Sequence, residues 1–98
     1  MKDNRMITSL NIENFLIHNG FTLNSGVYSH SDCELKADVL NRRLIYPDSI
    51  RGHDRNTSFD ANENFVVFEC VYRLLKKGYH PEDIELEKEW HLGHISYF

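Results

Sequence analysis

Apolar side chains along residues 10–19 follow the spacing of an amphipathic helix. Ile12 and Leu16 are four residues apart and therefore lie on the same helical face. Ser9 precedes this stretch and is a candidate N-cap. Gly20 follows it, where a left-handed residue ends many helices. The pattern predicts a short helix that stops at this glycine.

A stronger helical pattern covers residues 63–77. Its apolar positions fill a sector of about 220° of the helical wheel, which predicts that most sides of this helix are covered. Asp60 or Asn62 can cap its start, and Gly78 is expected to end it. Cys70 lies on the apolar side, so we expect a core thiol whose pKa burial raises.

Alternation of apolar and polar residues predicts the strands. Residues 43–46 form a short strand, and residues 84–92 form a half-buried strand with glutamates on its outer face. Residues 33–39 fit both strand alternation and a helical capping box, and both interpretations stay open. Residues 22–30 predict a loop or hairpin, and residues 49–60 a long loop of a kind that is often functional. The whole pattern predicts an α+β fold, a small helix–strand–helix–strand domain.

Composition narrows the class of protein. The 98 residues suffice for one small domain, and 12% aromatic residues supply a core. A net charge of −4 excludes a polybasic protein that binds nucleic acid through bulk charge. The sequence contains neither a long apolar run nor a secretory signal, so we expect no membrane contact. Cys33 and Cys70 are too few for a disulfide framework, which favours a cytoplasmic setting.

A local excess of positive charge lies between residues 36 and 55. This segment holds five Lys or Arg residues against three Asp residues in an otherwise acidic chain. Arg42, Arg43, Arg51 and Arg55 are the candidate contacts to nucleic-acid phosphates. The competing interpretation is an ordinary solvated loop.

Two short motifs have the spacing of metal ligands. His30 precedes Cys33 by three residues, and His91 precedes His94 by three. Together they offer a candidate zinc shell of three nitrogens and a thiolate. On a strand, however, the second pair would point to opposite faces. Ordinary surface and turn histidines are the favoured interpretation, and we expect no cofactor in this chain.

The second half of the chain carries motifs that resemble a known family. Residues 43–47 read RLIYP, residues 62–71 read NENFVVFECV, residues 74–87 read LLKKGYHPEDIELE and residues 90–94 read WHLGH. This order resembles the N-terminal region of type I restriction enzyme subunits and of fused restriction–methylation proteins of the N-6 adenine DNA methylase type. The resemblance covers a little over half of the chain.

The resemblance implies an incomplete restriction-endonuclease-like architecture. Glu69 would match the acid on the family's first helix, and residues 84–90 would match its first core strand. In the family, an Asp and a Glu-x-Lys on the following strands complete a magnesium site that activates water. This sequence lacks both at the matching places. We therefore expect the N-terminal domain of a longer restriction–modification protein, which positions DNA or a partner subunit and does not cut DNA on its own.

An alternative function is that of a protein–protein interaction module. The strand predicted over residues 84–92, which includes Trp90, would pair through its edge with another chain. A homodimer is one such pairing. Independently of this alternative, the competing interpretation of Glu69 is structural, as a surface ion pair with Arg73 one helical turn later.

Overall fold

Two helices and two antiparallel sheets make up the part of the chain that the computed structural model describes, residues 7–86 and 96–97. The predicted α+β class is confirmed, with more strands than the sequence pattern indicated. In chain order the elements are α1 (Ile12–His18), β1 (Thr22–Asn24), β2 (Val27–Ser29), β3 (Lys36–Asp38), β4 (Arg43–Ile45), α2 (Asn62–Lys76), the 3₁₀ helix η1 (Pro81–Asp83), β5 (Ile84–Glu85) and β6 (Ser96–Tyr97).

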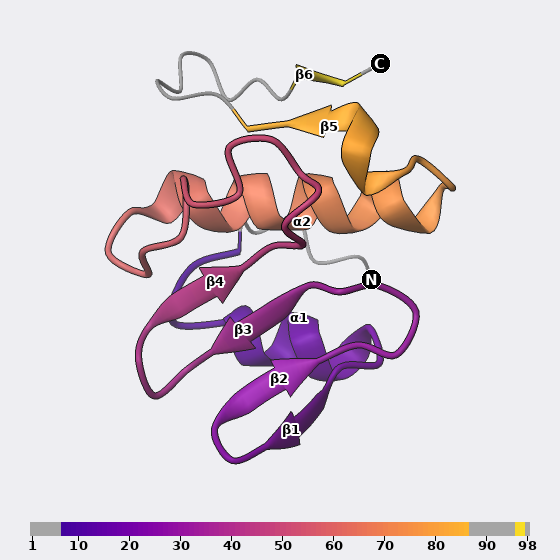
Figure 1. The fold of residues 1–98 in the computed structure, drawn as a ribbon. Coiled ribbons are helices and arrows are strands. Elements are labelled where there is room, and N and C mark those ends of the chain that lie inside the picture. The colour runs from indigo at the N-terminus through magenta and orange to yellow at the C-terminus, as the bar shows by residue number, and fades with distance from the viewer. Residues whose placement is uncertain (1–6, 87–95, 98) are drawn as a thin grey trace, which may run out of the picture.

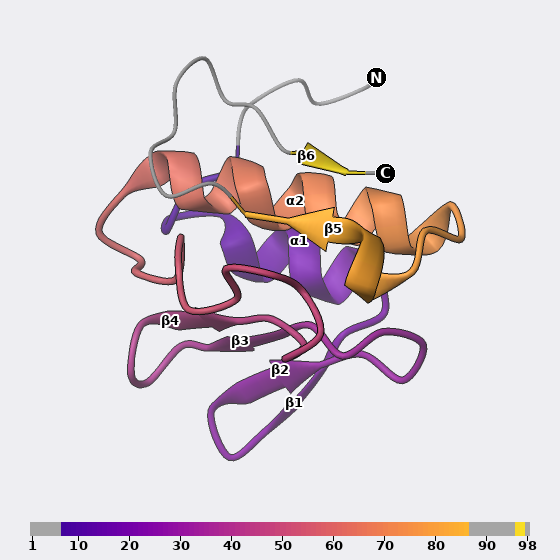
Figure 2. The same ribbon diagram turned by 45° about the horizontal axis from the view of Figure 1, so that its top comes forward.

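The first four strands form an antiparallel meander in the order β1-β2-β3-β4. Their registers align Leu23, Tyr28, Ala37 and Leu44 in one row across the sheet. Tyr28, Ala37 and Leu44 are buried, so this row belongs to the core face. Both helices lie on that side of the sheet (Figure 2). Leu23, at the edge of the row, is 55% exposed.

Helix α2 lies between two layers of strands. The meander is on one side, and β5 with β6 is on the other (Figure 1). Side chains of α2 share one buried cluster with residues of both layers, such as Leu44 and Ile84. The prediction that most sides of the helix are covered is confirmed only in part, because Cys70, Leu74 and Leu75 in the apolar sector are half-buried. Its buried residues are Asn64, Phe65, Val67, Phe68, Val71 and Tyr72.

The end of α1 follows the sequence prediction, but its start does not. Gly20 has a φ of +88°, and the Phe21 N–H donates to the Leu16 carbonyl at 2.9 Å, so the chain folds back on the helix. The predicted Ser9 cap is wrong, because the N-cap is Asn11. The Asn11 side chain accepts from the N–H of Thr8 at 2.7 Å and so braces the preceding turn.

The cap predicted for α2 is also wrong. The N-cap is Ala61, and no side chain bonds to the first helical N–H groups there. Asp60 instead forms an ion pair with Arg42 at 3.2 Å, so its carboxylate is engaged outside the helix. The C-terminal prediction is confirmed, since Gly78 ends the helix with a φ of +102°.

The segment with two open interpretations contains a strand. β3 pairs with β2 on one side and β4 on the other, which satisfies its backbone from both directions. The predicted hairpin is confirmed in the segment before it. Ser25 and Gly26 both have positive φ values, the geometry of a type I′ turn between β1 and β2.

The C-terminal strand is described only in part. β5 covers Ile84–Glu85 and pairs with β6, while residues 87–95, with Trp90, lie outside the described residues. Within the described part, neither helix is long and apolar enough to cross a membrane.

Candidate nucleic-acid interface

The long loop between β4 and α2 is joined to β5 by backbone hydrogen bonds. The Arg51 N–H donates to the Ile84 carbonyl at 3.1 Å, and the Leu86 N–H donates to the Arg51 carbonyl at 2.8 Å. These bonds make a short parallel bridge between Arg51 and Glu85. Ile50, fully buried, anchors the same part of the loop in the core. The loop that carries two of the predicted arginines is therefore fixed to the strand of the family-like motif.

Close backbone contact continues beyond Arg51. Gly52 has a φ of +77°, and a Cβ atom at this position would lie 2.5 Å from the Leu86 carbonyl oxygen. Only glycine fits this approach without displacing backbone. The Arg55 guanidinium reaches the same carbonyl, with Nη1 at 3.5 Å from the oxygen. Both Arg51 and Arg55 are exposed on this loop.

The other two predicted arginines contact the far end of the loop. The Arg42 guanidinium pairs with Asp60 at 3.2 Å and lies 5.6 Å from the centre of the Phe59 ring. Arg43 donates to the Thr57 hydroxyl at 3.2 Å. All four arginines thus belong to, or contact, the loop over residues 49–60. Asp60 offsets the charge of Arg42, whereas Arg51 and Arg55 belong to the end of the loop that is docked on β5.

A buried amide fixes the middle of the loop to α2. The Asn64 side chain donates to the Ser58 carbonyl at 2.9 Å and accepts from the Asn56 side chain at 3.1 Å. The Tyr46 hydroxyl donates to the Asn56 carbonyl at 3.3 Å, and burial raises the pKa of this tyrosine. Sequence analysis missed Asn64. Its only signal is a polar residue adjoining the apolar sector of the helix.

Glu69, the predicted match to a family acid, pairs with a cation on its own helix. Its Oε2 accepts hydrogen bonds from Nε of Arg73 at 3.0 Å and from Nη2 of the same guanidinium. The predicted i,i+4 ion pair is confirmed. Across residues 7–86 and 96–97, His, Cys, Asp and Glu side chains form no group of three or more that is suited to a metal ion.

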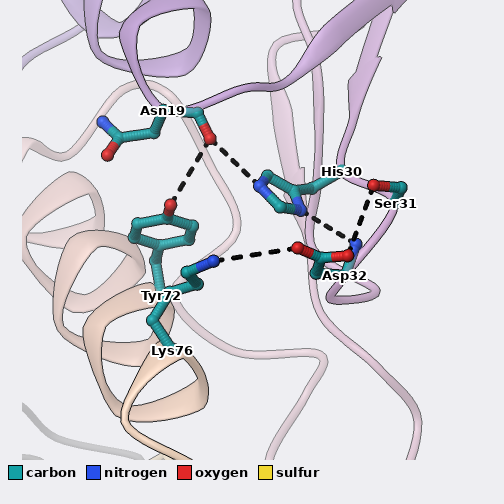
Figure 3. A network of polar contacts seen from close by, with 6 residues as sticks. All are labelled: Asn19, His30, Ser31, Asp32, Tyr72 and Lys76. Atoms are coloured by element: carbon teal, nitrogen blue, oxygen red, sulfur yellow. Dashed lines mark hydrogen bonds and ion pairs between the residues drawn. The ribbon is translucent and has the colours of Figure 1, made fainter.

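His30, a candidate zinc ligand, joins three elements of the fold instead (Figure 3). Its Nδ1 accepts from the Asp32 N–H at 3.0 Å, and its Nε2 lies 3.0 Å from the Asn19 carbonyl oxygen. These partners fit the neutral ring with the hydrogen on Nε2. The ring also packs edge-on against Phe21 and Tyr72. With both nitrogens engaged, His30 holds α1 and α2 to the loop after β2. His91 and His94 lie outside the described residues.

The two cysteines are free and half-buried. Burial raises the pKa of both thiols, the direction expected for Cys70, but the prediction that Cys70 lies in the core is wrong, because it is only half-buried. Cys33 lines an open hollow of about 770 Å³ between the loop after β2 and the segment after β4. A neutral, half-buried thiol is a weak nucleophile, so neither cysteine is a candidate for catalysis.

The predicted pairing of another chain along the C-terminal strand conflicts with the described part of that strand. β6 pairs with one side of β5, and Arg51 occupies the other side. The N–H of Leu86 is already bonded to the Arg51 carbonyl. The strand edge over residues 84–86 is therefore not free for a partner, because the chain's own loop fills it.

Comparisons with protein-family models, with curated proteins and with solved structures found no match to this chain.

Proposed function

We propose that this chain is a domain of a DNA restriction–modification protein that positions DNA against the loop over residues 49–60. The family motifs in the second half of the sequence support the protein class. The docking of the Arg51 segment on β5 supports the position of the interface. In this proposal the two features that the sequence presented separately, the loop with Arg51 and Arg55 and the GYHPEDIELE segment, act as one unit.

The observation that carries the proposal is the pair of backbone hydrogen bonds between Arg51 and β5. A surface loop normally loses conformational entropy when it binds a ligand. Here the backbone is already held on both sides of Arg51, so arginine side chains extend from a fixed base. Arginines in that setting suit phosphate contacts, which set the position of a duplex without reading its sequence.

In the proposed role, Glu69 stabilises α2 and does not take part in cleavage. Its carboxylate accepts two hydrogen bonds from Arg73 on the same helix. A magnesium site of the family type needs further acids from following strands. The role proposed for this chain is therefore to position DNA or a neighbouring subunit.

Fluorescence anisotropy of a labelled duplex tests this function. We expect weak binding that falls steeply with salt, because displaced counterions drive it. Changing both Arg51→Ala and Arg55→Ala should weaken binding about tenfold or more and lower the salt slope by about 2. The matched control is Lys76→Ala with Lys77→Ala, which removes the same charge from the end of α2 and should change binding by less than about twofold.

Two results would contradict the proposal. One is the absence of salt-dependent binding by the folded chain. The other is an equal loss of affinity in both double variants, which would indicate attraction by overall charge. Circular dichroism and thermal unfolding of each variant establish that the comparison is made between folded proteins.

A further inference from the structure

One stretch of the chain carries no charged side chain. Residues 14–31 contain no Asp, Glu, Lys or Arg, although these residues make up 27% of the protein. The stretch covers most of α1 and the whole hairpin of β1 and β2. It also contains two large apolar side chains that face solvent, Ile17 at 61% and Leu23 at 55% exposure. Depletion of charge with exposed apolar side chains is typical of the centre of a protein–protein interface.

Hydrogen-bond alternation across the meander shows which backbone groups its edges present. The type I′ turn makes Asn24 and Val27 the closing hydrogen-bonded pair, so the next pair, Leu23 and Tyr28, is not hydrogen-bonded. The N–H and C=O of Leu23 therefore point away from β2. Counting the same alternation to β4 places the Leu44 N–H outward, and this group donates to the Thr57 carbonyl at 2.7 Å.

The two edge strands of the sheet, β1 and β4, therefore differ in whether another segment of the chain pairs with their outer backbone groups. Residues 57–59 cover the outer edge of β4, through Leu44 and through a bond from the Phe59 N–H to the Arg42 carbonyl at 3.2 Å. Within residues 7–86 and 96–97, no segment pairs with the outer edge of β1. Edge strands are usually protected by their short length or by lysine, proline or a bulge. β1 is short, Thr-Leu-Asn, but has no lysine, proline or bulge.

We propose that β1 pairs with β1 of a second copy of this chain, antiparallel, about a two-fold axis at Leu23. Antiparallel pairing is two-fold symmetric, and the edge offers one outward donor and one outward acceptor on the same residue. The two Leu23 residues exchange both hydrogen bonds, and their side chains lie next to each other. The result is a continuous eight-stranded sheet.

Charge opposes a second copy least at this edge. The protein has a net charge of −4, so two copies repel each other over most of their surfaces. Residues 14–31 are the part of the chain where this repulsion is smallest. The pairing is independent of the proposed DNA interface, because it uses the opposite edge of the meander from the one that residues 57–59 cover.

Sedimentation velocity over roughly 10 µM to 1 mM protein tests the proposal, since small interfaces associate in this range. We expect dimers that increase with concentration. Leu23→Lys should raise the dissociation constant at least about tenfold, because it places like charges opposite each other. Ile45→Lys is the matched control. Ile45 is a partly exposed residue on β4, which is the edge strand at the opposite end of the sheet from β1. The control substitution should leave the constant within about twofold.

A cross-linking experiment covers the case in which Leu23→Lys fails to fold. In a hydrogen-bonded antiparallel pair the two Cα atoms are about 5.5 Å apart, within the range of a disulfide. Mild oxidation should therefore link Leu23→Cys into a dimer, while Ile45→Cys with the same two native cysteines stays monomeric. A wild-type chain that is monomeric at every concentration would overturn the proposal. So would equal effects of the changes at Leu23 and Ile45.

Discussion

The charge-free stretch over residues 14–31 and the arginine-bearing loop over residues 49–60 contrast in how their backbones are used. The stretch contains β1, whose outer edge lacks a partner among the described residues, and it presents Ile17 and Leu23 to solvent. The loop fills the edge of β5 with its own backbone and presents arginines. The difference indicates two kinds of partner. A neutral edge without a partner among the described residues suits another polypeptide, whereas a fixed loop that presents arginines suits a phosphate backbone.

The largest expected effect comes from breaking the loop at Gly52. Gly52→Ala places a Cβ atom 2.5 Å from the Leu86 carbonyl oxygen at a φ of +77°, so backbone must move. We expect a loss of about 3 kcal/mol in the free energy of unfolding, measured with urea, and weaker DNA binding. Gly78→Ala is the control. Gly78 also has a positive φ, but nothing lies within 4 Å, so the loss should be about 1 kcal/mol.

The second largest effect is expected at His30, which belongs to the charge-free stretch over residues 14–31. His30→Ala removes the ring that joins Asn19, Asp32 and Tyr72. We expect a loss of about 2 kcal/mol in the free energy of unfolding, with DNA affinity unchanged. Tyr72→Phe keeps the ring and removes only its hydrogen bond to Asn19 at 3.4 Å, so its cost should stay below about 1 kcal/mol. A DNA-binding defect in folded His30→Ala would contradict the separation of the two regions.

Alkaline unfolding reports on the core that both regions share. Burial raises the pKa of Tyr46 in the folded protein above its ordinary value of 10.0. Its contribution to stability is complete below pH 10, because both states are then protonated. The contribution is lost as pH rises further, because the unfolded tyrosine ionises first. Tyr46→Phe removes this titration and should flatten the fall in stability above about pH 10. An unchanged slope would contradict the burial of this hydroxyl.

The smallest effect is expected at Glu69, which belongs to neither region. Glu69→Gln removes the ion pair with Arg73 on the outer side of α2. Exposed pairs at this spacing contribute about 0.3–0.5 kcal/mol, and the melting temperature should fall accordingly by only a degree or two. A loss above about 2 kcal/mol would show that Glu69 has partners beyond Arg73.

The sequence predicted elements where local rules decide the structure. Gly20 and Gly78 end helices as expected, and the apolar period of α2 matches its burial. Caps were predicted less well, because Asp60 is taken by Arg42, a residue that is distant in sequence. The strand at residues 36–38 forms because β2 and β4 are available on both sides, which a local pattern cannot show.

The candidate site shows the same limit. The local charge pattern indicated Arg42, Arg43, Arg51 and Arg55. In the structure, all four contact the loop over residues 49–60 or lie in it. The charge pattern could not show that Arg51 docks on β5, since this bridge joins residues more than thirty positions apart. It also could not show that the loop would fill the strand edge that was expected to bind a partner. Both outcomes depend on long-range backbone pairing.

The most direct test of the central claim is an amide NMR titration of the chain with a short DNA duplex. The account predicts that the largest shift changes fall on residues 51–55 and on the neighbouring residues of β5. Amides of β1 and β2 should stay unchanged at constant protein concentration. Changes centred on the β1–β2 hairpin, or no changes at low salt, would contradict the assignment of the DNA interface to the docked loop.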